Sequence, residues 1–127
     1  MKELEEAEAW LDAARFTFDN PSRGPERYTV ATANSIHALI RANDALTMTF
    51  MKKASTRHEL APGLFAELIK QRKIDPKYAG LRELLTKAVA EKSEYDYKGT
   101  SVGKDKAARW IRETEEFIRS VREVLAL

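Results

Sequence analysis

The chain has 127 residues, of which 43% are apolar and 33% charged, and this size and composition are typical of one globular domain. Its net charge of +2 is too small to indicate nucleic-acid binding by itself. The absence of cysteine excludes disulfides, thiolate metal sites and cysteine catalysis. No apolar run approaches about 18 residues and the start Met-Lys-Glu-Leu-Glu-Glu argues against a signal peptide, so we expect a single cytoplasmic domain over residues 1–127 with no membrane segment.

The first half of the chain predicts two helices of different character. Residues 2–18 repeat apolar side chains at alternating spacings of three and four, and the proline-rich segment 20–25 ends that helix. Residues 26–53 predict a second helix, long enough to cross the domain. Between positions 28 and 51 its only charged residues are Arg41 and Asp44, and its apolar residues surround most of the circumference. Such a helix is normally buried among others.

The second half predicts one short helix and two long ones. The short helix follows residues 54–58 and has Pro62 in its first turn. The next helix is opened by an Asp75-Pro76 cap and carries a stripe from Tyr78 to Tyr95. The last helix covers residues 104–125. No alternating strand pattern occurs in the sequence. The expected fold is therefore all-α, an antiparallel up-and-down bundle of four long helices plus one short helix.

A narrow polar stripe crosses the apolar second helix. Asn34, His37, Arg41 and Asp44 follow one another at steps of three, four and three, which places them within about a quarter of the helix circumference. An imidazole, a guanidinium and a carboxylate together could hold an anion or perform acid–base chemistry. The same residues could instead form a buried network in which Asp44 neutralises Arg41, or part of a dimer interface.

The fourth predicted helix adds two further candidates. Lys92 interrupts its apolar stripe, and its ammonium group could extend into solvent, or reach Asp44, Glu94 or a bound phosphate. Tyr95, near the end of that helix, could plug the end of the bundle or stack on a base. His58 follows a basic segment, and we expect it to be a solvated loop residue. With only two histidines and no paired ligand spacing, the sequence predicts no metal or cofactor site.

Two segments resemble the HEPN superfamily. Residues 35–47, Ser-Ile-His-Ala-Leu-Ile-Arg-Ala-Asn-Asp-Ala-Leu-Thr, resemble the second helix of small bacterial and archaeal members, and residues 92–97, Lys-Ser-Glu-Tyr-Asp-Tyr, with the amphipathic last helix resemble the later half. The resemblance implies an up-and-down bundle around a central cleft, commonly a homodimer. It also implies one of two roles: partner of a small nucleotidyltransferase in a two-gene module, or metal-independent ribonuclease with an Arg-x(4–6)-His motif.

The chain departs from the ribonuclease pattern. No arginine lies at that spacing before His37 or His58, and no histidine follows position 58. We therefore expect a non-catalytic HEPN-type bundle that self-associates and binds a nucleotide-like ligand, RNA or a protein partner such as a nucleotidyltransferase. The candidate ligand or interface residues are Asn34, His37, Arg41, Asp44, Lys92 and Tyr95. Two alternatives remain: a ribonuclease or toxin-type enzyme using His37 or His58, and a purely structural dimeric module.

Overall fold

The computed structural model covers residues 1–127 and describes every side chain except those of residues 96–98, so Asp96 and Tyr97 of the second HEPN-like segment lie outside the described side chains. The helices are α1 (Lys2–Asp19), α2 (Glu26–Met51), α3 (Ala61–Lys70), α4 (Leu81–Lys98) and α5 (Lys104–Leu125), with short 3-10 turns η1 (His58–Leu60) and η2 (Pro76–Tyr78). No strand occurs along the described backbone. The predicted all-α class is confirmed.

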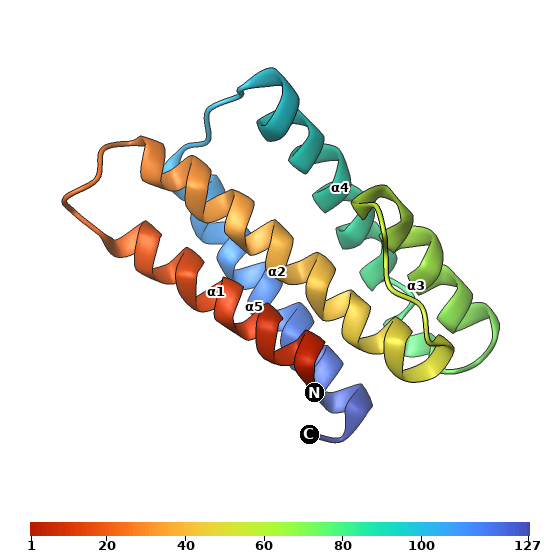
Figure 1. Ribbon diagram of the computed structural model, residues 1–127. Helices are drawn as coiled ribbons and strands as arrows, with labels where there is room; N and C mark the ends of the chain where they lie inside the picture. Colours follow the sequence, from red (N-terminus) through yellow and green to blue (C-terminus); the bar gives the residue numbers. More distant parts are fainter.

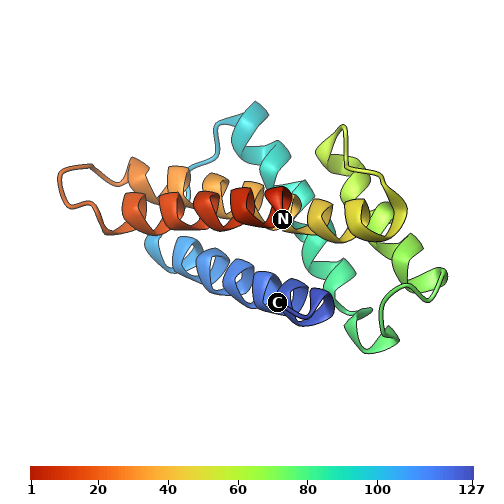
Figure 2. The same ribbon diagram turned by 60° about the horizontal axis from the view of Figure 1, so that its bottom comes forward.

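Helix α2 is the centre of the arrangement. Helices α1 and α5 pack against it on one side, and α3 and α4 pack on the other (Figures 1 and 2). Helix α1 runs antiparallel to α2, and the two chain termini lie at the same end of the molecule (Figure 1). Helices α4 and α5 have little direct packing against each other: α5 packs mainly on α2, whereas α4 packs on both α2 and α3.

The apolar periodicities place the core on these contacts. Helix α1 buries the residues of its predicted stripe, namely Leu4, Ala7, Leu11 and Ala14. Helix α5 contributes Trp110 and Phe117, neither of which is exposed. Thirteen of the 26 residues of α2 are buried, as expected for a helix that is apolar on most sides. The Thr114 hydroxyl donates to the Ser35 carbonyl at 3.1 Å, which satisfies a polar group at the contact between α2 and α5.

Two predicted boundaries were wrong. Helix α2 ends at Met51 rather than Lys53, because Lys52 adopts a left-handed backbone conformation with φ of 57°. The Asp75-Pro76 step opens η2 rather than α4: the Asp75 carboxylate accepts the Lys77 N–H at 2.8 Å, and only one 3-10 turn follows. Tyr78 therefore precedes α4. None of the helices in the described chain is long and apolar enough to cross a membrane.

Candidate functional site

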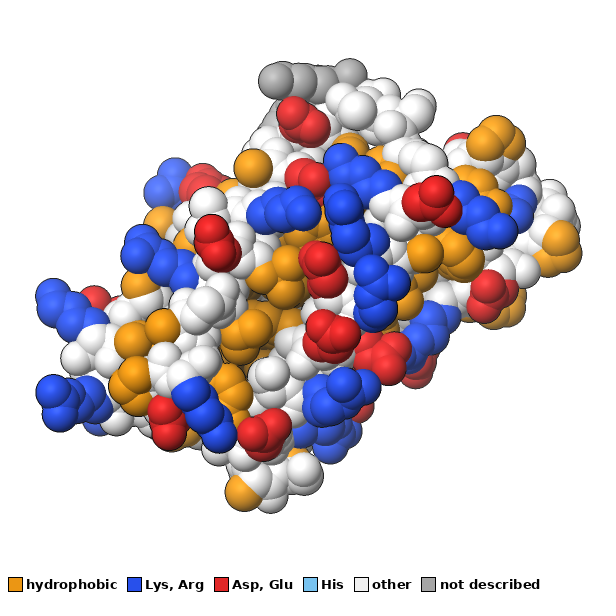
Figure 3. All heavy atoms as spheres, turned by 180° about the vertical axis from the view of Figure 1, so that it is seen from behind, with side chains coloured by type: hydrophobic (Ala, Val, Ile, Leu, Met, Phe, Trp, Pro, Cys, Tyr) orange, Lys and Arg blue, Asp and Glu red, His pale blue; other side chains and the backbone are white. Residues whose placement is uncertain are grey.

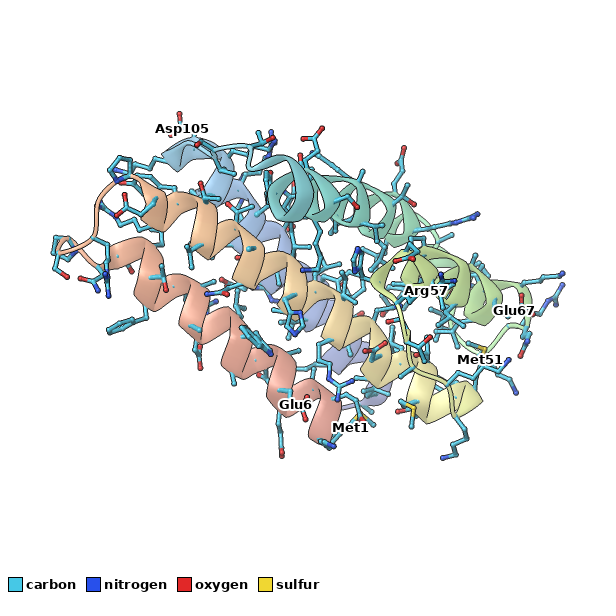
Figure 4. The ribbon with its side chains drawn as sticks, turned by 45° about the horizontal axis from the view of Figure 1, so that its top comes forward. Met1, Glu6, Met51, Arg57, Glu67 and Asp105 are labelled. Atoms are coloured by element: carbon cyan, nitrogen blue, oxygen red, sulfur yellow. The ribbon has the colours of Figure 1, made fainter. Side chains whose placement is uncertain are left out.

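One pocket collects most of the polar stripe of α2. It has a volume of about 330 Å³ and lies between α2, the segment that precedes α3, and α4. Its lining residues are His37, Ile40, Arg41, Asp44, Ser55, His58 and Lys92. We call this cavity the α2 pocket. Figure 4 shows Glu6 and Arg57 on either side of α2, marking α1 and the segment before α3 between which the stripe lies.

Asp44 joins the pocket wall to the loop that follows α2. Its side chain is only 6% exposed. One carboxylate oxygen accepts both the Ser55 N–H at 2.9 Å and the Ser55 hydroxyl at 2.7 Å. The other oxygen accepts Arg41 Nη1 at 3.2 Å. A buried carboxylate with three donors is well compensated, so Asp44 fixes the position of Ser55 on the pocket wall.

Arg41 is held by two carboxylates from two helices. Besides Asp44, its Nε donates to Glu6 Oε2 of α1 at 2.8 Å. The hydrogen bond to Glu6 raises the pKa of the Arg41 guanidinium above its usual value, with a further contribution from the bond to Asp44. The same Arg41 hydrogen bond lowers the pKa of Glu6. Arg41 is therefore a fixed cation whose charge is already largely balanced.

His37 lies between this ion pair and an aromatic ring of α1. The Trp10 ring packs edge-to-face on the imidazole, with ring centroids 4.4 Å apart. Burial lowers the pKa of His37 below its usual value of 6.5, and the positive charges of Lys92 and Arg41 lower it further. At neutral pH the imidazole is therefore uncharged, with one N–H donor and one nitrogen acceptor.

His58 occupies a different environment from the one expected. The sequence predicts a solvated loop histidine, but the residue begins η1, its side chain is 25% exposed, and it lines the α2 pocket. Its Nε2 lies 3.8 Å from Glu59 Oε2, an ion pair when the imidazole is protonated. The fold thus brings the only two histidines of the chain into one cavity.

The six predicted site residues separate into two groups. His37, Arg41, Asp44 and Lys92 line the α2 pocket together. Asn34 is half-buried and is not part of the pocket lining. Tyr95 lies elsewhere, against the start of α2 and the segment before α5, and its hydroxyl donates to Glu91 at 3.2 Å.

Sequence reasoning missed Ser55 as a site residue and misplaced His58. The available signal is the short connection between α2 and α3. Only six residues, 52–57, separate Met51 from η1, so the chain must return along α2 at once. Residues on that return path necessarily lie near the last turns of α2, where Asp44 is found.

The arrangement offers two imidazoles, a hydroxyl, an ammonium and a balanced guanidinium around one small cavity. These groups can bind an anion through hydrogen bonds and can exchange protons with it. Among the described side chains, no cluster of three or more metal-ligating groups forms. Comparisons with protein-family models, curated proteins and solved structures returned no match to this chain.

Proposed function

We propose that the α2 pocket binds a phosphate-bearing, nucleotide-like ligand and does not turn it over. The observation that carries this proposal is the convergence of Arg41, Lys92 and both histidines on one cavity of about 330 Å³. That volume is at the lower end of the range of small-molecule sites, which suits a phosphate with a small attached group. Ser55 adds a hydroxyl on the pocket wall.

The charges around the pocket favour an anion whose binding is coupled to protonation, either of the anion itself or of a histidine in the pocket. Glu6 and Asp44 balance the charge of Arg41, and His37 is neutral at pH 7. A phosphate placed in the pocket would favour the charged imidazole and so raise the pKa of His37. Binding is therefore expected to strengthen as the pH falls from 7.5 to 6.

The resemblance to the HEPN superfamily supports a proposal for the fold and the partner of the protein that contains this pocket. We propose that the five helices form a HEPN-like up-and-down bundle that self-associates. A small nucleotidyltransferase is the protein partner that the resemblance suggests. The proposal places the protein among binding modules rather than enzymes, because the chain has no Arg-x(4–6)-His pair.

A thermal-shift titration tests the binding proposal. Wild type, Arg41→Ala and the control Arg122→Ala are heated with inorganic phosphate, adenosine monophosphate or a short RNA. Arg122 suits the control because it is also ion-paired, to Glu8 at 2.7 Å, outside the pocket. A ligand at a hundred times its dissociation constant adds about 2.7 kcal/mol, or roughly 10 °C for a chain of this size.

The shift should occur in wild type and Arg122→Ala and be lost in Arg41→Ala. No shift with any of the three ligands would contradict the proposal. The remaining interpretation would then be a structural dimeric module in which Arg41 and Asp44 only fix the helix register.

A second candidate function is metal-independent RNA cleavage, and the placement of both histidines in one pocket favours it. One imidazole would take the 2′-hydroxyl proton as the 2′-oxygen bonds to phosphorus. The other, as an imidazolium, would give its proton to the 5′-oxygen as the bond from phosphorus to that oxygen breaks, which leaves a 2′,3′-cyclic phosphate. The test is cleavage of labelled RNA in the presence of a chelator by wild type, His37→Ala and His58→Ala. Activity that survives both substitutions would exclude this candidate.

A further inference from the structure

A groove lies between α4 and α5, on the face opposite the one seen in Figure 1. It has a volume of about 940 Å³. Its lining residues are Ala79, Gly80, Arg82, Glu83, Leu84, Thr86, Lys87, Ala90 and Glu113. Seen from behind, apolar side chains form the floor of this hollow and charged side chains border it (Figure 3). We call it the α4–α5 groove.

The groove exists because the described side chains of α4 and α5 are joined only near one end. There, the Glu91 carboxylate accepts the Trp110 indole N–H and forms an ion pair with Lys106 at 3.0 Å. Beyond this point α4 continues along α2 and α3, and its remaining packing against α5 is slight. The half of α4 from Leu81 to Ala90 therefore presents a face that no other helix covers.

That face is suited to close contact with another helix. Ala79, Gly80, Thr86 and Ala90 are small and exposed, so a second backbone can approach closely. Leu84 is half-buried beside them and supplies apolar area. Exposed small residues alone do not establish an interface, and the charged residues of the groove supply the second observation.

The groove carries charges of both signs, and the described residues form no ion pair with them. Glu113 Oε2 is buried and has no hydrogen-bond partner among the described side chains. Arg82 and Lys87 line the same groove, and neither forms an ion pair within the part of the chain that the structure describes; the ammonium of Lys87 lies 5.7 Å from the centre of the Trp110 ring. Glu113 as a whole is half-buried and lines the groove, so a positive group that enters the groove would compensate its charge.

We propose that the α4–α5 groove is the interface of a two-fold homodimer. In a two-fold contact each copy presents the same surface, so the surface must complement itself. This groove does so, because it carries both an acidic group, Glu113, and two basic groups, Arg82 and Lys87. Glu113 of one copy faces the Arg82 and Lys87 side of the other, and Leu84 packs across the axis. A typical interface covers about 800 Å² on each copy, roughly a tenth of the 7081 Å² surface of this chain.

The proposal gives a location to the self-association included in the proposed function, and it is independent of ligand binding in the α2 pocket. The test is sedimentation-velocity measurement of mass at micromolar concentration. Wild type should sediment at twice the 14.5 kDa of one chain. The acidic-site variant Glu113→Lys and the basic-site variant Arg82→Glu/Lys87→Glu should each dissociate at least tenfold more readily, since like charges then meet at both halves of the interface.

Mixing the two variants provides the decisive arm. In a heterodimer of the acidic-site and basic-site variants, every contact again joins opposite charges, so the mixture should recover dimers within about threefold of the wild-type dissociation constant. The matched control is Arg119→Glu, an exposed charge reversal on α5 outside the groove, which should leave the mass unchanged. Melting temperatures within about 3 °C of wild type, measured on each variant before mixing, establish that the variants fold.

Each contrary result has a separate meaning. A dimer that ignores all of these substitutions would overturn the groove interface but leave self-association standing. A wild-type monomer would overturn both, while the thermal-shift result for phosphate would still decide the function of the α2 pocket. Failure of the mixed variants to associate would also overturn the two-fold pairing.

Discussion

Ser55 donates two hydrogen bonds to one oxygen of Asp44, from its backbone N–H at 2.9 Å and from its hydroxyl at 2.7 Å. This double contact ties the loop after α2 back onto the last turns of that helix. Asp44 simultaneously accepts Arg41 through its other oxygen. The carboxylate thus supports both the shape of the loop and the orientation of the guanidinium, and the two roles can be separated by substitution.

Asp44→Asn should lower the free energy of unfolding by about 1–3 kcal/mol, because Arg41 loses a charged acceptor at a site that is nearly closed to solvent. Ser55→Ala removes only the hydroxyl donor and should cost about 1 kcal/mol. The control is Asp12→Asn, whose carboxylate pairs with Arg15 at the same helical spacing but with 76% exposure. That change should stay within about 0.5 kcal/mol. Urea denaturation measures all three, and equal losses at Asp44 and Asp12 would contradict the structural role of Asp44.

The pH dependence of His37 should be visible in the fluorescence of Trp10. Burial lowers the pKa of His37 in the folded state below its usual value of 6.5. As the pH falls through that lowered pKa, the imidazole becomes charged against the indole ring, and an imidazolium quenches indole emission. The emission of Trp10 should therefore fall below pH 6.5, and the change should be absent in both His37→Gln and Trp10→Phe. Quenching that persists in Trp10→Phe would assign the effect to the other tryptophan.

The same shift fixes the direction of the stability change. The unfolded chain takes up a proton at His37 near pH 6.5, whereas the folded chain resists it. The free energy of unfolding should thus fall as the pH decreases from about 6.5 through the lowered pKa of the folded state, and be independent of this group at higher pH. In His37→Gln this part of the decrease should be missing. A wild-type protein that gains stability from His37 over that interval would contradict the assignment.

Glu6→Gln should increase the affinity of the α2 pocket for inorganic phosphate. Glu6 is one of the two carboxylates that balance the charge of Arg41, with which it forms an ion pair at 2.8 Å. Removing its charge makes the pocket more positive, so phosphate should bind about threefold or more tightly in calorimetric titration at low salt. Glu5→Gln, an exposed carboxylate on the same helix, is the control and should have no effect. Weaker binding in Glu6→Gln would indicate that Glu6 is needed to position Arg41.

Glu91 should be important for stability because it serves three donors. Its carboxylate accepts the indole N–H of Trp110, the Tyr95 hydroxyl and the Lys106 ammonium. Glu91→Ala leaves the buried indole N–H without an acceptor and should cost about 1–3 kcal/mol, and Glu91→Gln, which retains an oxygen, should cost less. Exposed Glu94 on the same helix is the control for urea denaturation, with an expected change within about 0.5 kcal/mol on substitution by alanine. Similar values for Glu91→Ala and Glu94→Ala would contradict the importance of this cluster.

The parts of the fold that follow from apolar periodicity could be predicted from the sequence. The buried stripe of α1 and the range of α5 agree with the expected positions, because each depends only on the 3.6-residue repeat. The same repeat brings His37, Arg41 and Asp44 to one pocket, since they share a helix face. Lys92 joins them because α4 packs on α2.

The remaining features depend on tertiary geometry or on turn chemistry. Ser55 and His58 enter the pocket because the chain folds back along α2, which the short 52–57 connection indicates but no side-chain pattern encodes. Tyr95 lies away from the pocket because its position along α4 places it near the start of α2. At Asp75-Pro76 a capped turn and a capped helix begin with the same residues, so the cap signal alone could not distinguish them.

His37 meets the α2 pocket on one side and the Trp10 ring on the other, and burial holds its pKa below 6.5. An anion bound in the pocket favours the charged imidazole, so binding is accompanied by proton uptake from the buffer. The measured heat of binding should therefore depend on the ionisation enthalpy of the buffer. Calorimetric titrations of the unlabelled protein in two buffers thus report occupancy of the pocket without any spectroscopic probe.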